Sequence, residues 1–184
     1  MRRGSFYGLV VGVALFAASV LSSEEPPLSE YQLKAVFLYN FAKFVEWPKE
    51  AFAGPATPFT IGVLGQNPFG DELNRTVSNK TLDGHPFAIK YLRTFSEVST
   101  CHILFICSSE RKRVADVLKA ASAGNVLTVA ETDRFLQAGG MIRFVMEQNK
   151  VRFEINDEAA KNGGLRISSK LLGVAKRVET DGVK

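Results

Sequence analysis

The sequence is poor in the side chains that carry metal-dependent chemistry, with only two histidines and two cysteines among 184 residues. His102 directly follows Cys101. Neighbouring residues of a strand point to opposite faces of a sheet, so these two side chains cannot share an ion there. No cysteine and histidine spacing typical of a structural zinc site is present. The sequence therefore predicts no metal site and no cofactor.

Strand geometry also argues against a disulfide bond between the two cysteines, Cys101 and Cys107. Residues 102–106 are typical of a buried strand, which at about 3.3 Å per residue would place the cysteines about 20 Å apart. A disulfide requires Cα atoms within about 7 Å. If the strand is correct, no bond forms within the chain, and we expect the two thiols to be free or bonded to another chain.

A strong excess of one charge is lacking as well. Lys and Arg number 23 and Asp and Glu 19, which gives a net charge of +4. Residues 1–23 contain Arg2, Arg3 and no acid, so the remainder carries only +2. A small net charge with both signs interspersed excludes the basic footprint of a nucleic-acid-binding protein. Internal repeats and low-complexity tracts are also missing.

No catalytic arrangement can be assembled from the sequence. The segment 168–170 (Ser-Ser-Lys) resembles a serine–lysine pair, but the motif needs serine three residues before the lysine, where Ile167 stands. The spacing of Gly62, Gly65 and Gly70 does not match the dinucleotide-binding fingerprint, and tight turns account for these glycines better. We therefore predict that the protein is not an enzyme.

The most informative feature that is present is the N-terminal segment. Arg2 and Arg3 precede an uncharged stretch whose apolar core runs from Leu9 to Leu21 and which ends in small serines. This pattern predicts a cleaved signal peptide at residues 1–23. The alternative is an uncleaved inner-membrane anchor, since about 20 apolar residues can span a bilayer. Both alternatives place the remaining chain in the periplasm.

The rest of the chain predicts a short linker at residues 24–29 and one domain at residues 30–180. Nearly continuous apolar strands alternate with helices, which is typical of strands covered on both faces. The last two strands alternate more clearly and are joined by a short connection, as in a hairpin. The predicted fold is a three-layer α/β/α domain with a mixed, mainly parallel sheet and an antiparallel C-terminal hairpin at its edge.

The individual elements follow from apolar periodicity and from capping and turn residues. The expected helices are residues 28–47, 69–77, 111–123, 132–138, 157–162 and 168–178, and the expected strands are 59–64, 87–92, 103–107, 126–130, 141–146 and 151–155.

The first predicted helix has Ser29 as its cap and Pro48 as its stop. It carries two apolar stripes. They comprise Val36, Phe37, Asn40, Phe41 and Phe44 on one side and Tyr31, Leu38, Ala42 and Val45 on the other. A helix that is apolar on two sides needs two partners. One is its own core, and the other is more of the same domain, a twin subunit or a foreign protein.

Several segments resemble the YfiR family of exported α/β proteins. They are YQLKAVFLYNFAKFVEWP (31–48), CHILFI (101–106), NVLTV (125–129), GGMIRF (139–144), VRFEIN (151–156) and GLRISSKLL (164–172). The segments are long and keep their order, and the resemblance covers essentially all of the chain beyond the predicted signal peptide.

This resemblance implies a non-enzymatic periplasmic regulator. The family's named member represses a membrane-bound diguanylate cyclase through its periplasmic part, which lowers cyclic di-GMP and biofilm formation. An outer-membrane lipoprotein relieves the repression by sequestration, and family members occur as dimers. The named member is stabilised by disulfides that two cysteines on one strand cannot reproduce, so redox control is not carried over.

If the chain is such a repressor, the first helix is expected to meet the partner. The candidate partner-binding residues are Tyr31, Leu38, Val45 and Trp47. A charged residue at Leu38 or Trp47 should then release the partner without unfolding the domain. For Trp47 the structural alternative is a lid on the core, although tryptophan is enriched at binding hot spots.

The alternative function is a periplasmic sensor of a small molecule or anion that acts on a histidine kinase or another membrane receptor. The candidate ligand-binding residues are Asn40, Lys43, Arg152, Asn156 and Lys170. Three of them also have a structural explanation. Asn40 can fasten its helix to a loop, Arg152 can pair with Glu154 or be solvated, and Asn156 can cap the next helix.

Overall fold

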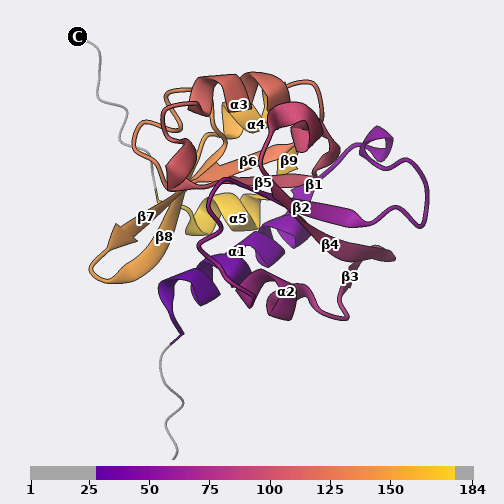
Figure 1. Ribbon diagram of the computed structural model, residues 1–184, viewed down its shortest axis with the longest axis horizontal. Helices are drawn as coiled ribbons and strands as arrows, with labels where there is room; N and C mark the ends of the chain where they lie inside the picture. Colours follow the sequence, from indigo (N-terminus) through magenta and orange to yellow (C-terminus); the bar gives the residue numbers. More distant parts are fainter. Residues whose placement is uncertain (1–27, 177–184) are drawn as a thin grey trace, which may run out of the picture.

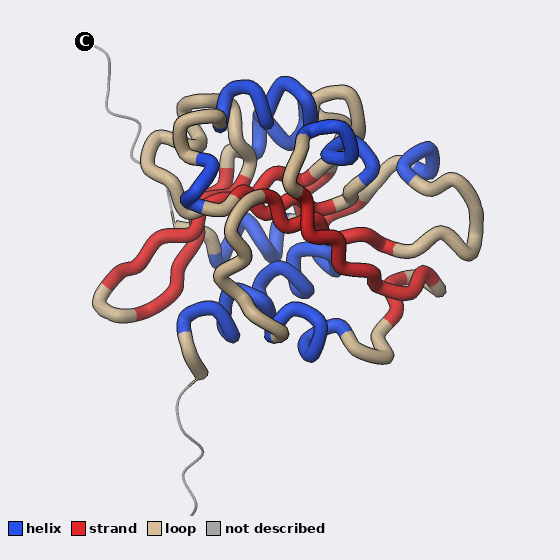
Figure 2. The backbone as a smooth tube through the Cα atoms, in the orientation of Figure 1, coloured by secondary structure: helices blue, strands red, loops and turns tan. Residues whose placement is uncertain are grey.

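A seven-stranded sheet runs through the centre of the molecule, with helices on both of its faces (Figure 1 and Figure 2). The computed structural model describes residues 28–176. The predicted signal peptide at residues 1–23 and most of the predicted linker at 24–29 lie outside the described residues and stay predictions.

The sheet is mixed and mainly parallel, and the predicted three-layer α/β/α fold is confirmed. In spatial order its strands are β3 (Thr81–Leu82), β4 (His85–Leu92), β2 (Phe59–Leu64), β5 (Ile103–Ile106), β6 (Leu127–Ala130), β7 (Ile142–Glu147) and β8 (Lys150–Ile155). β3 and the predicted hairpin strand β8 pair antiparallel at the two edges, and the other pairs are parallel. β2, β5 and β6 are buried along their whole length because both faces are covered.

The path of the chain through this sheet reverses once. After β2 the chain forms β4 on one side, then crosses to β5 on the other side and continues outward through β6 and β7. The carboxyl ends of β2 and β5 therefore mark a topological switch point, where open α/β sheets leave room for ligands.

Two groups of helices enclose the sheet. One face carries α1 (Glu30–Phe44), α2 (Glu72–Val77) and α5 (Ser169–Val174), and the other carries α3 (Val114–Ala121) with α4 (Asp157–Asn162) beside it (Figure 1). Short 3-10 turns lie at Lys49–Ala51, Phe95–Thr100 and Ser108–Glu110. The larger apolar core lies between α1 and the sheet, and a second one lies under α3.

The cap of α1 is the one predicted, although the helix begins at Glu30, two residues after the predicted start at residue 28. The Gln32 N–H donates to Ser29 Oγ at 3.3 Å, and the Ser29 N–H donates to Gln32 Oε1 at 2.7 Å, so the two residues form a capping box. The same kind of cap starts α5, where the Leu171 N–H donates to Ser168 Oγ at 3.3 Å.

The end of α1 differs from the prediction, which carried the helix to Trp47. The helix ends at Phe44, because β1 (Val45–Glu46) turns into an extended conformation and pairs antiparallel with β9 (Arg166–Ile167). Two local preferences favour this ending: valine is β-branched, and the residue before Pro48 avoids helical geometry.

Other predicted limits also need correction. Residues 132–138 form turns instead of a helix, and Arg134 adopts a left-handed conformation (φ 59°) that a helix cannot contain. α3 begins at residue 114 and not 111, because a 3-10 turn occupies the preceding segment. α5 ends at residue 174, since Lys176 joins the edge of β8 through a hydrogen bond from its N–H to the Phe153 carbonyl.

Both cysteines are buried, and they form no disulfide with each other within the described residues. Burial raises the pKa of the Cys101 thiol to about 11 and that of the Cys107 thiol to about 12. A thiol with so high a pKa is a poor nucleophile at neutral pH, so these residues act as small apolar core side chains.

The inner face of α1 packs on the sheet through large apolar side chains. Leu38 and Phe41 are fully buried. The Phe41 ring centroid lies 5.7 Å from that of Phe144 on β7 and 5.1 Å from that of Phe153 on β8. Leu38 therefore belongs to the core, and the expectation that a charge at Leu38 leaves the domain folded is wrong.

We predict that Leu38→Ala lowers the free energy of unfolding by about 2–5 kcal/mol, because it leaves a cavity between α1 and the sheet. Urea denaturation followed by circular dichroism measures this loss. The control is Val36→Thr on the exposed side of the same helix, which should change stability by less than about 0.5 kcal/mol. Similar losses for both variants would contradict the observed rotation of α1.

Candidate functional site

The four residues predicted to bind a partner do not lie together on one surface of the structure. Leu38 and Val45 are buried in the core, so neither lies on an accessible interface. Trp47 is half-buried, its indole N–H donates to the Asn125 carbonyl at 3.0 Å, and its ring meets that of Phe59 edge-on at 4.9 Å. These contacts agree with the structural alternative for Trp47, in which its ring covers the core. Tyr31 lines a cavity, which is described below.

The residues predicted to bind a ligand do not form one site either. Phe153 packs on α1, so its neighbour Arg152 points to the opposite face of β8, away from Lys43 on α1. Arg152 is exposed, while Glu154 pairs with Arg143 on the adjacent strand and not with Arg152. Lys43 and Lys170 are exposed as well, and Asn40 is half-buried on α1.

The prediction that Asn156 caps a helix is confirmed. Its Oδ1 accepts the Ala159 N–H at 2.9 Å, and its Nδ2 donates to the Leu136 carbonyl at 3.2 Å. Both ends of the amide are therefore committed to the fold, one to α4 and the other to the turn that precedes β7.

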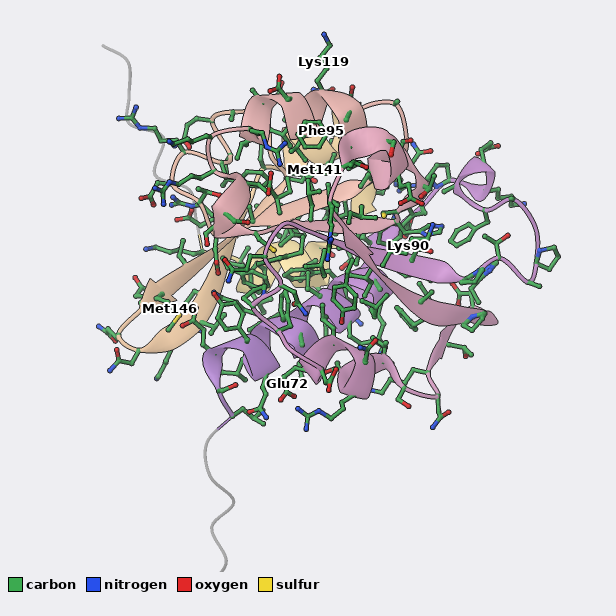
Figure 3. The ribbon with its side chains drawn as sticks, viewed as in Figure 1. Glu72, Lys90, Phe95, Lys119, Met141 and Met146 are labelled. Atoms are coloured by element: carbon green, nitrogen blue, oxygen red, sulfur yellow. The ribbon has the colours of Figure 1, made fainter. Side chains whose placement is uncertain are left out.

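A cavity of about 480 Å³ opens between the start of α1 and the carboxyl end of β6. It is lined by Glu30, Tyr31, Lys34, Glu131, Asp133, Arg143, Phe144, Val145 and Met146. Met146 stands near the tip of the β7–β8 hairpin, which reaches out beyond the body of the domain (Figure 3). Charged side chains dominate the cavity, and three apolar residues of β7, Phe144, Val145 and Met146, border it.

Lys34 is the most unusual of the lining residues, because a lysine is only 2% exposed there. Its Nζ lies 2.5 Å from Glu131 Oε2 and also pairs with Glu30, one helical turn earlier. The ammonium group lies 4.6 Å from the centroid of the Tyr31 ring, within the range of a cation–π contact. The two carboxylates and the ring compensate for the water that the buried ammonium loses.

Tyr31 completes this cluster. Its hydroxyl donates to Glu131 Oε1 at 3.2 Å, and its ring meets that of Phe69 edge-on at 5.5 Å. Burial and the adjacent Glu131 carboxylate raise the pKa of Tyr31 to about 12, so the phenol keeps its proton at physiological pH. The hydroxyl acts as a fixed donor that orients Glu131 toward Lys34.

A second ionic group lies at the rim of the cavity. The Arg143 guanidinium contacts Glu154 at 2.7 Å and Asp133 at 3.4 Å. Each cation of the cavity is thus held by two carboxylates, Lys34 by Glu30 and Glu131 and Arg143 by Asp133 and Glu154. The arrangement is suited to fastening α1 to the ends of β6 and β7.

Sequence reasoning missed Lys34 and Glu131, although each carries a signal. Lys34 lies four residues before Leu38 and seven before Phe41, in phase with the buried stripe of α1. Glu131 directly follows β6, so it lies at the carboxyl edge of a parallel sheet, where functional side chains collect. A lysine at a buried position of a helix and an acid at the carboxyl edge of the sheet together predict a buried ion pair.

Four rings form a separate stack under the loop that follows β1, in which Phe59 and His102 are buried and Phe52 and His85 are half-buried. Phe52 lies between the two histidines, with ring centroids 4.3 Å from His85 and 4.6 Å from His102, and Phe59 covers the other side of His102 at 4.7 Å. His102 Nδ1 accepts the Thr60 N–H at 3.0 Å, which leaves its Nε2–H to donate to the Ala51 carbonyl at 3.1 Å.

This environment favours neutral imidazole. Burial lowers the pKa of His102, and the nearby His85 lowers it further, against the opposing effect of the hydrogen bond to Ala51. Within residues 28–176, no three His, Cys, Asp or Glu side chains gather as metal ligands, and no helix has the length and apolarity to cross a membrane.

Comparisons with known proteins agree with this architecture. The sequence model of the YfiR/HmsC-like family matches residues 31–176. The fold is similar to the crystal structure of a conserved domain protein from Vibrio cholerae O1 biovar El Tor, with a TM-score of 0.55, 12% identity and coverage of 82% of this chain. The match spans only 60% of that solved chain, and its low identity informs on the fold alone. No curated protein matches the chain.

We predict that Lys34→Met destabilises the domain by about 3 kcal/mol, because it leaves the Glu131 carboxylate without its buried partner. The double variant Lys34→Met/Glu131→Gln should recover at least about 1 kcal/mol of this loss. Urea denaturation measures both. Lys43→Met, at an exposed position on the same helix, serves as the control with little effect. If the double variant loses as much free energy of unfolding as Lys34→Met and Glu131→Gln lose in sum, the two residues are not energetically coupled, and the prediction is wrong.

His102 predicts a specific dependence of stability on pH. Because its pKa is lowered in the fold, the unfolded chain binds the proton more readily, and stability falls as the pH drops below about 6.5. Thermal unfolding from pH 7.5 to 5 should show a smaller decrease for His102→Gln than for the wild type. His85→Gln should retain most of the wild-type dependence, because burial is the largest cause of the lowered pKa of His102. An unchanged slope in His102→Gln would show that other groups cause the decrease.

Proposed function

The chain belongs to the YfiR/HmsC-like family, and from this premise we propose that it is an exported regulator that acts by binding, with no reaction of its own. Its target is the periplasmic part of a membrane-bound diguanylate cyclase, which it represses, so that cyclic di-GMP falls. An outer-membrane lipoprotein that sequesters the chain would relieve the repression. Family membership supports a role in cyclic di-GMP signalling in general, and the surface of α1 and α5 supports the proposed mode of action.

The supporting observation is a group of large apolar side chains exposed on adjacent helices. Val36 and Phe44 on α1 are 39% and 36% exposed, and Leu172 and Val174 on α5 are 36% and 68% exposed. With Asn40 between the first two, these residues form what we term the α1–α5 surface. Soluble domains seldom leave neighbouring large apolar side chains in water unless a partner covers them.

The fold itself brings the two helices together. The Ser168 N–H, at the start of α5, donates to the carbonyl of Phe44, the last residue of α1, at 2.9 Å. The pairing of β1 with β9 holds the same junction one residue further along. On α1, positions 36, 40 and 44 follow one another at intervals of four residues and therefore share a stripe. The surface is rigidly supported, which favours recognition without a large entropic cost.

This surface revises the residues proposed for partner binding. The outer stripe of α1 takes the place of Leu38 and Val45, which face the core. Asn40 fits the proposal, because a half-buried amide within an apolar surface can fix the register of a partner by hydrogen bonding. A homodimer could use the same surface, and the experiment below separates the two uses.

We predict that Val36→Lys and Val174→Lys each abolish repression and weaken binding to the periplasmic part of the cyclase at least about tenfold, since they place a charge in a desolvated contact. Both positions are exposed, so the melting temperature should stay within a few degrees of the wild type. Binding is measured with purified proteins, and repression by the cellular level of cyclic di-GMP.

The matched control is Tyr91→Lys, which adds the same charge at an exposed aromatic position on β4 and should bind and repress like the wild type. Light scattering on each variant reports the oligomeric state. Loss of binding in monomeric and dimeric preparations alike supports the proposal. Full repression by a Val174→Lys variant, whether monomeric or dimeric, would overturn it.

A further inference from the structure

The switch point of the sheet holds a second cavity that the proposed function does not use. It has a volume of about 280 Å³ and lies between the loop that follows β2 and the loop that follows β5. Its lining comprises Gln66, Asn67, Pro68, Ser108, Ser109 and Arg111. In open parallel sheets, the crevice outside the carboxyl ends of the strands at the point of reversal is the place where ligands bind.

Direct contacts hold the two loops against each other. Gly65 adopts a left-handed conformation (φ 99°), and a Cβ atom at this position would clash with Ser109 Oγ and lie 2.9 Å from Glu110 Cγ. The Gln66 N–H donates to Ser109 Oγ at 3.0 Å, and the Cys107 N–H donates to the Leu64 carbonyl at 3.0 Å. The cavity is therefore largely preformed, as small-molecule sites usually are.

The polar groups of the cavity are mainly hydrogen-bond donors. Ser109 Oγ accepts the Gln66 N–H, so its own proton remains to be donated, and the Ser108 hydroxyl is exposed. Asn67 is committed to its own turn, because its Oδ1 accepts the Phe69 N–H at 2.9 Å. Arg111 is exposed and adds a planar guanidinium with several parallel donors.

No carboxylate lines the cavity to oppose this positive charge. The neighbouring acid, Glu110, is buried and accepts from Arg113 Nε at 2.9 Å. Arg113 in turn lies over the ring of Phe95, with its guanidinium carbon 4.8 Å from the ring centroid. Glu110 is thus paired with Arg113, and Arg111 is the one charged residue among those that line the cavity.

We propose that this switch-point cavity binds a small phosphate-bearing molecule through Arg111 and the hydroxyls of Ser108 and Ser109. A guanidinium and hydroxyl donors match the geometry of phosphate oxygens. The volume is at the lower limit for small-molecule pockets, about 300 Å³, so a phosphate monoester fits and a dinucleotide does not. The site is independent of the α1–α5 surface, on which the proposed partner binding rests.

The test is calorimetric titration of the purified chain, without any partner, with inorganic phosphate and with a sugar phosphate monoester. We expect saturable binding that Arg111→Gln weakens about 10- to 100-fold, in keeping with the loss of a charge-assisted hydrogen bond. Lys112→Gln removes the same charge one residue away, outside the lining, and should change affinity less than about twofold. Tighter binding of the monoester would identify the organic phosphate as the ligand, and tighter binding of inorganic phosphate would identify the free ion.

Chemical-shift mapping provides a readout that does not depend on the stability of any variant. Added phosphate should shift the amides of residues 65–68 and 108–111 and leave those of α1 and α5 unchanged. The proposal is overturned by the absence of saturation up to about 10 mM ligand, by equal losses in Arg111→Gln and Lys112→Gln, or by shifts spread over the whole surface. None of these results affects the cyclase-binding proposal, which is tested with other residues and another partner.

Discussion

Most of this structure depends on one constraint, namely which face of α1 is turned toward the sheet. Phe41 packs on aromatic side chains of β7 and β8, and Leu38 is buried in the same core. The helical repeat then fixes which way the other side chains of α1 point. Lys34 must enter the interior, where it needs the carboxylates of Glu30 and Glu131. Val36 and Phe44 must point outward, where a partner can reach them. The orientation of α1 therefore produces both the ionic cluster and the apolar surface.

The sheet places both the ionic cavity and the switch-point cavity along the same carboxyl edge. The ionic cavity lies at the end of β6, and each of its two cations is paired with two carboxylates, which suits a fastening role. The switch-point cavity lies at the ends of β2 and β5 and presents unmatched donors, which suits a ligand. The parallel order of the central strands explains why both lie there, because every loop that leaves the carboxyl ends opens on one side of the domain.

The sequence could predict those features that depend on neighbouring residues. The cap at Ser29, the buried central strands and the β7–β8 hairpin follow from local patterns, and the structure contains all of them. The rotation of α1 could not be predicted, because two apolar stripes allow either side to face the core. The β1–β9 pair was missed since each strand has only two residues and its partner lies far away in the chain. Lys34 was missed because its burial depends on Glu131, nearly a hundred residues later.

The central claim is that this chain acts through direct contact made by the α1–α5 surface. Site-specific photo-cross-linking in living cells tests it most directly, with the cross-linking residue placed at Val174 on α5 or at Tyr91 on β4, both exposed. The account predicts a covalent adduct with the diguanylate cyclase from position 174 and none from position 91. An adduct with the cyclase from position 91 alone would contradict it.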